Sequence, residues 1–146
     1  MDDASGDDTG RVLPGVPGLR YLRNARNLGF IGACNAGAAL ARGEFVVFLN
    51  NDTIAQPGWL DALLDTFDQH PGTGLAGSKL VYPDGRLQEA GGIVFADGSA
   101  ANYGRNGDPA DPRYNFVREA DYCSGAALAI PRSLFKELGG FDAHYS

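Results

Sequence analysis

The stretch EFVVFLNND, residues 44–52, decides the fold class of this 146-residue chain. Positions 45–49 are apolar without alternation and include β-branched and aromatic side chains, which is typical of a strand covered on both faces. Such strands lie in parallel sheets with helices on each side. The stretch therefore predicts a central parallel strand that ends in a polar triplet.

A helix is expected on each side of this strand. The Ala-rich residues 30–42 place apolar and small side chains on one face at helical spacing, and Gly43 provides a stop. Pro57 opens the second segment, in which apolar side chains recur on one face as far as Phe67 and acidic ones lie away from it. Helix, strand and helix together predict a mostly parallel α/β sheet.

Shorter elements are predicted in the rest of the chain. Residues 1–18 indicate a loop that feeds a short strand at 19–22. Two apolar runs, 75–81 and 92–95, flank the turn signal Pro83-Asp84-Gly85 and indicate a hairpin-like pair. The remaining predictions are a long surface loop at 97–115 packed down by its aromatic residues, a strand at 126–130, and a helix at 131–138 ended by Gly139 and Gly140.

Composition limits the classes of function. With 44% hydrophobic and 21% charged residues, the chain has the balance of one compact domain over residues 1–146. A net charge of −6 leaves no basic stripe for a phosphate backbone, so no nucleic-acid partner is expected. No apolar run reaches the roughly 18 residues of a membrane span, and a soluble, cytoplasmic protein is predicted. Cys34 and Cys123 are too few for a disulfide framework.

The polar triplet Asn50-Asn51-Asp52 stands where an α/β sheet binds ligands, beyond the carboxyl end of a strand. A carboxylate at this place can hold a divalent cation against a diphosphate and so help to neutralise a departing phosphate. The alternative is that the triplet forms a turn and caps the next element, since Asn and Asp favour both. Taken alone, the triplet favours the turn.

The surrounding motifs change that balance. In chain order they are Asn27-Leu28-Gly29, residues 33–37 (ACNAG), residues 41–44 (ARGE), Asn50-Asn51-Asp52, residues 57–60 (PGWL), residues 77–80 (GSKL), residues 82–85 (YPDG), residues 121–125 (DYCSG) and residues 139–142 (GGFD). Together they resemble the family 2 glycosyltransferases, which have the GT-A fold, a Rossmann-like, mostly parallel three-layer sandwich. Within that family the chain is most similar to bacterial rhamnosyltransferase-like members, which often carry Asn-Asn-Asp where others carry Asp-x-Asp.

The resemblance implies a role for each matching residue. Asp52 would coordinate Mg²⁺ or Mn²⁺ bridging the diphosphate of a nucleoside-diphosphate sugar, with Asn50 and Asn51 in positions where many relatives have an acid. The other implied contacts are Asp3 to the nucleotide base, Arg26 and Asn27 near the nucleotide, and Ser124 and Gly125 toward the acceptor. Each has a plainer alternative from the residues alone: a mobile acidic terminus, a turn before a helix, and a turn that starts a strand.

The implied reaction is inverting transfer of a sugar to an acceptor hydroxyl, in bacterial polysaccharide or cell-envelope glycan synthesis, with a glycan or lipid-linked acceptor. Relatives begin with a strand and a helix ahead of Asp3 and carry the catalytic base after the segment 139–142. We therefore expect a partial GT-A domain, no catalytic base within it, no turnover by the chain alone, and possible self-association through the exposed sheet edge.

Two alternatives to an enzyme remain at this point. One is a non-catalytic nucleotide-sugar binding module, such as half of a tandem transferase, and the other is a nonfunctional truncation product. An NAD-binding oxidoreductase is disfavoured because residues 72–77 (GTGLAG) match G-x-G-x-x-G in the wrong context, after a predicted helix and before a strand-like run.

Overall fold

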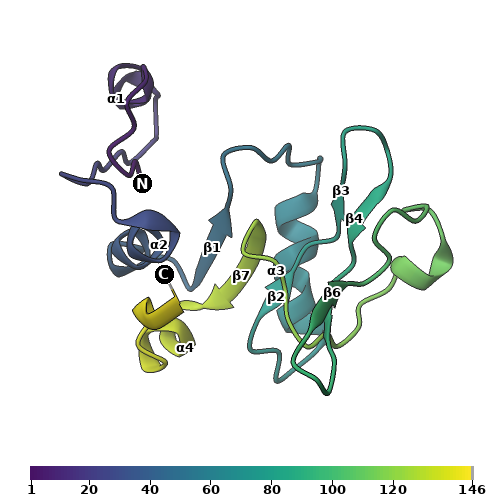
Figure 1. The fold of residues 1–146 in the computed structure, drawn as a ribbon. Helices are drawn as coiled ribbons and strands as arrows, with labels where there is room; N and C mark the ends of the chain where they lie inside the picture. Colours follow the sequence, from purple (N-terminus) through teal and green to yellow (C-terminus); the bar gives the residue numbers. More distant parts are fainter. Residues whose placement is uncertain (146) are drawn as a thin grey trace. The chain divides into compact units, whose positions relative to one another are not determined.

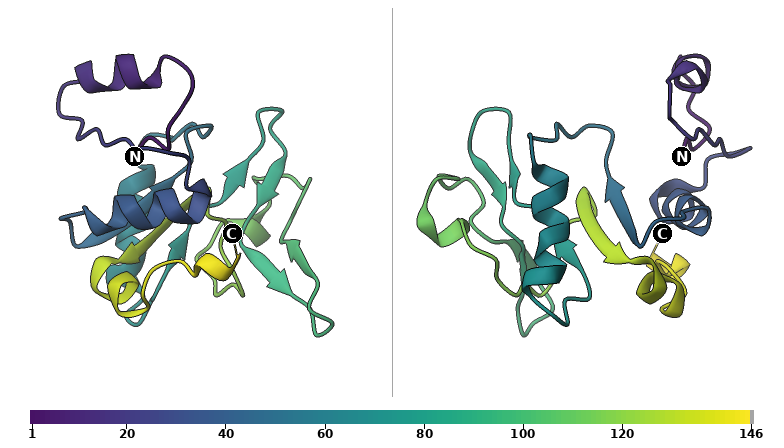
Figure 2. Two further views of the ribbon diagram at one scale, coloured as in Figure 1. Left: turned by 60° about the vertical axis from the view of Figure 1, so that its left-hand side comes forward. Right: turned by 180° about the vertical axis from the view of Figure 1, so that it is seen from behind.

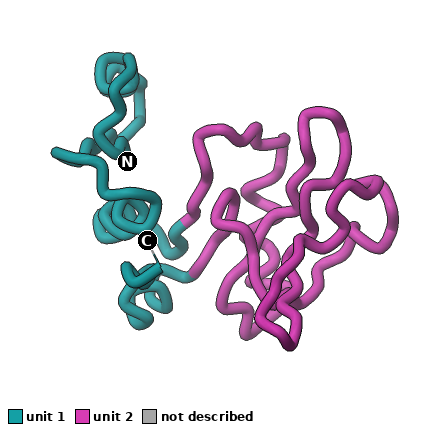
Figure 3. The backbone as a smooth tube through the Cα atoms, viewed as in Figure 1, with its two compact units in different colours: residues 1–46, 131–146 teal, residues 47–130 magenta. Residues whose placement is uncertain are grey.

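A computed structural model describes residues 1–145 (Figure 1). The chain divides into two compact units (Figure 3). Unit 1 consists of Met1–Val46 and Pro131–Ser146, and unit 2 consists of Val47–Ile130. Unit 1 is thus built from two separate segments, whereas unit 2 is continuous in sequence. No helix within residues 1–145 is long and apolar enough to cross a membrane.

Unit 1 is mainly helical. Its helices are α1 (Thr9–Val12), α2 (Gly29–Ala39) and α4 (Arg132–Glu137), with 3₁₀ turns η1 (Leu13–Gly15) and η3 (Ala143–Tyr145). The predicted loop at 1–18 is wrong in part, because it contains α1 and η1. The predicted strand at 19–22 is also wrong: an isolated parallel bridge joins Asp2 to Arg23 instead. A strand-like run of four residues does not by itself reveal whether a partner strand extends beside it.

Helix α2 is tied to the segment after α4 by one side chain. The Asn35 amide nitrogen donates to the Phe141 carbonyl at 2.8 Å, and the Phe141 amide donates back to Asn35 Oδ1 at 2.9 Å. Gly139 and Gly140 end α4 with φ of 81° and 85°, a region that favours glycine. A β-carbon on Gly140 would lie 2.6 Å from Asn35 Oδ1, so this position has no room for a side chain.

The core of unit 2 forms around helix α3 (Trp59–Gln69). Its predicted apolar face is confirmed: Leu63 is buried with Ala76 and Ala129, and Phe67 packs against them. Gly58 precedes the helix at φ 73°, and Asp61 in the first turn suits the positive end of the helix dipole. The Trp59 indole N–H donates to Ser78 Oγ at 2.7 Å. The helix is therefore fixed by both apolar and polar contacts.

The main sheet has three strands in the order β1 (Phe45–Leu49), β7 (Ala127–Pro131) and β2 (Ala76–Gly77). The strand at 44–49 is confirmed, but its predicted central place is wrong: β7 lies between the other two and has four buried residues in succession. β2 runs antiparallel to β7, with Ala76 opposite Ala129.

The parallel direction predicted for the β1 strand is also wrong. Bonds from the Asn50 amide to the Ala126 carbonyl and from the Arg132 amide to the Glu44 carbonyl flank β1 and β7 in antiparallel fashion. A continuous apolar run indicates that both faces are covered, but it does not determine which strand is the neighbour or how it runs. The relative direction of β1 and its neighbour therefore could not be predicted from the hydrophobic pattern of residues 45–49.

Two hairpins complete unit 2 (Figure 2). β3 (Leu80–Val81) pairs with β4 (Leu87–Glu89) across the predicted turn at residues 82–85, and β5 (Gly92–Val94) pairs with β6 (Ala100–Asn102). The turn is confirmed, but the predicted pairing of 75–81 with 92–95 is wrong. β4 has a single apolar residue in three, so it leaves no strand pattern in the sequence.

The predicted loop at 97–115 contains β6 and the 3₁₀ turn η2 (Pro112–Tyr114). Its aromatic residues do pack it down, since the rings of Tyr103 and Tyr114 meet edge to face with centroids 5.2 Å apart. Lys79 Nζ also donates to the Pro109 carbonyl at 3.0 Å. The loop is thus held by Lys79, which precedes β3, and by backbone bonds of Leu87 in β4 with Asn106 and Gly107.

Candidate functional site

The triplet Asn50-Asn51-Asp52 follows β1 directly. The Asn50 amide donates to the Ala126 carbonyl at 2.9 Å. The Asn50 carbonyl accepts bonds from the Thr53 amide at 3.3 Å and from Thr53 Oγ1 at 2.6 Å. The backbone of the triplet is therefore a turn, as its plainer alternative predicts, and that turn is fixed in place by the residue before β7.

Asp52 differs from most other acidic residues of the chain. Its side chain is exposed, and no hydrogen bond or ion pair engages its carboxylate within residues 1–145. The turn therefore does not use the carboxylate as a cap. A free carboxylate at the end of a strand is available to a ligand, so the turn and the binding role are compatible.

The donor set suits a hard cation held partly by a ligand. Mg²⁺ is commonly bound by one or two carboxylates, with phosphate oxygens and waters completing its shell. Asp52 supplies one carboxylate, and Asn50 and Asn51 supply amide oxygens next to it. No cluster of three or more His, Cys, Asp or Glu residues that could hold a metal exists within residues 1–145. The residues thus fit a cation that arrives with a diphosphate better than a permanent metal centre.

Ser124 and Gly125 lie beside the triplet, because the Asn50 amide binds the carbonyl of the next residue, Ala126. Ser124 Oγ accepts a bond of 3.3 Å from the Ala126 amide and so closes a local turn. The segment Cys123–Ala126 is called the 123–126 segment below. It packs closely on β2: a β-carbon on Gly77 would lie 2.5 Å from that of Cys123. Two predicted parts of the site, from separate regions of sequence, therefore meet in unit 2.

Asp3 links the N-terminal segment of unit 1 to the loop before α2. Its carboxylate accepts bonds from Asn24 Nδ2 at 2.7 Å and from the Leu28 amide at 2.9 Å. These bonds, the one from Asn24 most, lower the pKa of Asp3. The predicted mobile terminus is therefore wrong, since the carboxylate organises the loop ahead of α2. Its contact with a nucleotide base stays a prediction.

Asp2 is the more buried of the acidic pair, at 4% exposure, and sequence reasoning missed its role. Its carboxylate accepts bonds from the Tyr21 hydroxyl, from Arg23 Nη1 at 2.6 Å and from the Ser5 amide at 2.8 Å. The Tyr21 and Ser5 bonds, with a smaller effect of the Arg23 charge, hold the pKa of Asp2 far below its usual range. Burial of an acid next to the N-terminus leaves no signal in composition or periodicity.

Arg26 and Asn27 lie in the loop before α2 and are exposed. Asn27 Oδ1 accepts the Gly29 amide at 2.9 Å, which is the turn before a helix that its plainer alternative predicts. Arg26 has no hydrogen bond or ion pair within residues 1–145. Asn27 is thus engaged by the fold, and Arg26 is available to a ligand.

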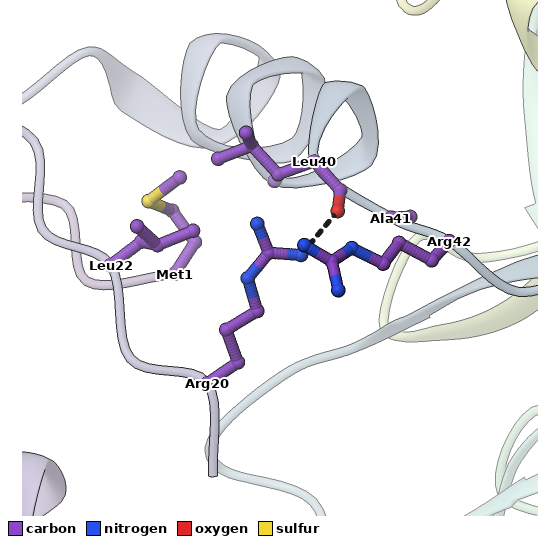
Figure 4. Close-up of a pocket in the computed structure, with 7 residues that line it drawn as sticks. Met1, Arg20, Leu22, Leu40, Ala41 and Arg42 are labelled. Atoms are coloured by element: carbon purple, nitrogen blue, oxygen red, sulfur yellow. Dashed lines mark hydrogen bonds between the residues drawn. The ribbon is translucent and has the colours of Figure 1, made fainter.

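A hollow of about 380 Å³ in unit 1 lies apart from these predicted residues (Figure 4). Arg20 donates to the Leu40 carbonyl at 2.8 Å across it and so caps the end of α2. The residues that line it are Met1, Arg20, Leu22, Gly37, Leu40, Ala41 and Arg42. Because neither Asp3 nor Arg26 lines this hollow, it does not support the predicted nucleotide contacts.

Comparison with known families decides the identity of the fold. The sequence model of the family described as "Glycosyl transferase family 2" matches residues 1–139. The chain belongs to this family. The family implies the GT-A fold and nucleotide-sugar donors, often used with a divalent metal, and it makes this chain a glycosyltransferase sequence.

Three relatives of this chain from bacteria illustrate the similarity. The chain is 36% identical to an uncharacterized protein of Sinorhizobium fredii over 85% of this chain and 14% of that protein. It is 35% identical to an O-antigen biosynthesis protein of Myxococcus xanthus, over 76% of this chain and 9% of the relative. An N-acetylglucosaminyl-diphospho-decaprenol L-rhamnosyltransferase of Mycobacterium tuberculosis is 29% identical over 99% of this chain and 54% of the relative. The chain thus spans at most about half the length of these three relatives.

Proposed function

We propose that this family 2 glycosyltransferase sequence carries the donor diphosphate contact and part of the acceptor wall of an inverting transferase. The observation that supports it is the junction of the free Asp52 carboxylate with the 123–126 segment through the bond from Asn50 to Ala126. A leaving group and an acceptor must meet at one point for transfer, and this junction brings their two predicted contacts together.

The chain's own residues account for part of the reaction. Asp52 would hold a divalent cation, and the cation when bound would neutralise charge on the diphosphate. The 123–126 segment orients the acceptor, whose hydroxyl oxygen bonds to the anomeric carbon as the bond from that carbon to the diphosphate breaks. The hydroxyl proton passes to a general base, which we assign to no residue of this chain.

The substrate class is proposed from the relatives. Names that include O-antigen biosynthesis and a decaprenol-linked L-rhamnosyltransferase favour a bacterial glycan or lipid-linked acceptor. Arg26 and Asp3 would contact the nucleotide in unit 1. The alternative is a non-catalytic nucleotide-sugar binding module, which would bind donor through the same residues and transfer nothing.

The test is transfer by the full-length protein from UDP-, GDP- and dTDP-sugars with Mg²⁺ or Mn²⁺ present. We expect one donor class to be used, and the anomeric configuration of the product, read by NMR, to be inverted. Donor binding without transfer to any acceptor supports the binding module instead. Retention of configuration contradicts the inverting mechanism.

A further inference from the structure

Unit 2 contains a hollow of about 400 Å³ that the proposed function does not use. It lies where the turn of the β3–β4 hairpin meets a second turn, at residues 104–107 of the loop at 97–115. The residues that line it are Tyr82, Pro83, Asp84, Arg86, Arg105 and Asn106. Sites for small molecules have volumes of roughly 300–1,000 Å³, so this hollow is large enough for one small ligand.

Backbone bonds hold the two turns together. The Gly107 amide donates to the Gly104 carbonyl at 2.8 Å and closes the second turn. Leu87, which is fully buried, donates its amide to the Gly107 carbonyl and accepts the Asn106 amide at its own carbonyl, both at 2.8 Å. The walls of the hollow are therefore set by backbone pairing, and a ligand need not order them on binding.

The side-chain oxygens of the hollow that can only accept hydrogen bonds are already in use. Arg86 Nε and Nη2 lie 2.8 Å and 2.7 Å from Asp84 Oδ2, and Arg86 Nη1 donates to Asn106 Oδ1 at 3.2 Å. The other carboxylate oxygen, Asp84 Oδ1, accepts the Arg86 amide at 3.0 Å. These acceptors are therefore engaged by the fold and offer little to a ligand.

The donors of the hollow, in contrast, are free. The Arg105 guanidinium, the Tyr82 hydroxyl and the Asn106 side-chain nitrogen form no hydrogen bond within residues 1–145. Arg105 is exposed and forms no ion pair in that part of the chain. Two arginines against one aspartate also leave a positive excess. Free donors, engaged acceptors and positive charge favour an anionic ligand.

The shapes of these side chains narrow the kind of anion. A guanidinium presents a planar fork of N–H groups that matches a carboxylate or a phosphate. Tyr82 is half-buried, so part of its ring is accessible in the same hollow. A tyrosine ring offers an apolar surface with a polar tip, and a sugar ring offers an apolar C–H face edged with hydroxyls. A sugar that carries an anionic group suits both side chains.

We propose that this hollow is a subsite for an acidic sugar residue of the acceptor glycan. Arg105 binds the carboxylate or phosphate of that residue, Asn106 donates to one of its oxygens, and the Tyr82 ring packs on its apolar face. The naming of the acceptor as the source of this sugar rests on the proposed function, whereas the binding site itself does not. A contact of this kind selects acidic glycans over neutral ones.

Equilibrium titration of the full-length protein tests the site. The probes are glucuronate and glucose 6-phosphate, with a chelator present so that no divalent metal draws them to Asp52. We expect at least one of them to bind about tenfold or more tighter than glucose, which lacks the charge. Arg105→Gln should remove most of this difference. The matched control is Arg42→Gln, which should change nothing, because Arg42 is an exposed arginine of unit 1 without a hydrogen bond or ion pair within residues 1–145.

Smaller probes separate an acidic sugar from an anion alone. Acetate and inorganic phosphate carry the charges without the ring, so each should bind about fivefold or more weakly than the corresponding sugar acid. Tyr82→Ala should weaken the binding of the sugar acids more than that of the small anions. Small anions that bind as tightly as the sugar acids would overturn the sugar assignment, and equal binding by Arg105→Gln and the wild type would overturn the site.

Transfer kinetics separate this inference from the proposed function. With an acidic acceptor, Arg105→Gln should raise the acceptor KM about fivefold or more and leave kcat and the donor KM nearly unchanged. If the wild type transfers no sugar while acidic sugars still bind through Arg105, the proposed function fails and the acceptor assignment with it, but the subsite stands. If the wild type transfers sugar while neither glucuronate nor glucose 6-phosphate binds better than glucose, the subsite is overturned and the proposed function stands.

Discussion

Asp2 and Asp3 in unit 1 and Asp52 in unit 2 are indistinguishable as acidic residues in the sequence. In the structure, they differ in whether other groups of the chain bind their carboxylates. The carboxylates of the first pair are engaged by a tyrosine, an arginine, an asparagine and backbone amides. The Asp52 carboxylate has no such partner within residues 1–145. Engaged carboxylates support the fold, and a free one at a strand end is open to a ligand, so substitutions should divide along this line.

The largest effect is expected at Asp52. In the full-length protein, Asp52→Asn should lower transfer by a factor on the order of 10² or more, because charge on the diphosphate then lacks its cation contact. Thermal stability should stay nearly unchanged, since an exposed turn residue contributes little to the core. Transfer assays and donor titrations with and without a chelator measure both effects. Asp68→Asn, which removes an exposed carboxylate from α3, is the control. Normal turnover by Asp52→Asn would contradict the metal-binding role and leave the turn as the only role of the triplet.

Asp2→Asn should do the reverse and lower the thermal midpoint clearly, because it weakens the bonds from Tyr21 and Arg23. The depressed pKa of Asp2 gives the sign of the pH dependence. Its stabilisation is present above the ordinary carboxyl value of about 4 and is lost as pH falls toward the folded-state pKa. Thermal melts between pH 7 and pH 2 test this. Asp8→Asn, which breaks an exposed ion pair with Arg11, should change little, and equal effects of the two variants would contradict the structural role of Asp2.

Glu89 is a third kind of acid, buried without a countercharge. Glu89→Gln should raise the free energy of unfolding by about 1 kcal/mol at neutral pH, because the buried charge disappears while a polar side chain of the same shape remains. The pKa of Glu89 is raised, so the charged form is the costly one and the gain should shrink as pH falls toward the ordinary glutamate value. Denaturant unfolding at several pH values measures it. A destabilised glutamine variant would show that an unseen positive partner compensates the charge.

Arg26→Ala should give the smallest effect. Arg26 is exposed and unpaired within residues 1–145, so unfolding free energy should change by less than about 0.5 kcal/mol. If it contacts the nucleotide, donor Kd should rise a few-fold, and the rise should shrink with added salt. Titration of the full-length protein with donor at two ionic strengths measures this. An unchanged donor Kd would show that Arg26 does not contribute to nucleotide binding.

The sequence predicted the elements with strong periodicity and missed those without it. Helix α3 was predictable because Trp59, Leu63 and Phe67 recur on one face at helical spacing. The strand at 45–49 was predictable as a strand, but its edge position depends on β7, which is some 80 residues later in the chain. β4 was missed because three residues, two of them polar, carry no pattern. Long-range pairing is the part that local patterns do not contain.

The candidate site likewise contains residues that the sequence indicated and features that it did not indicate. Asp52 was assigned a binding role because it follows a buried strand, a general place for ligands, and because the surrounding motifs resemble a known family; that role stays a prediction. The family motifs implied that Ser124 faces the acceptor, and that role stays a prediction; the bond from Asn50 to Ala126, which brings this segment beside the triplet, was not predicted. The burial of Glu89 could not be predicted, because glutamate is usually exposed and burial depends on tertiary packing. Asp2 was passed over in favour of Asp3 for the same reason.

The reciprocal bonds between Asn35 and Phe141 have a consequence for synthesis on the ribosome. The two residues are 106 positions apart, so the contact waits until the later one has been made. At about 5–20 residues per second, this delay is roughly 5–20 s. Unit 2 is continuous and can form as it emerges, whereas helix α2 spends that interval without its partner. During translation, α2 therefore forms first and gains this contact only when unit 1 is completed by its second segment.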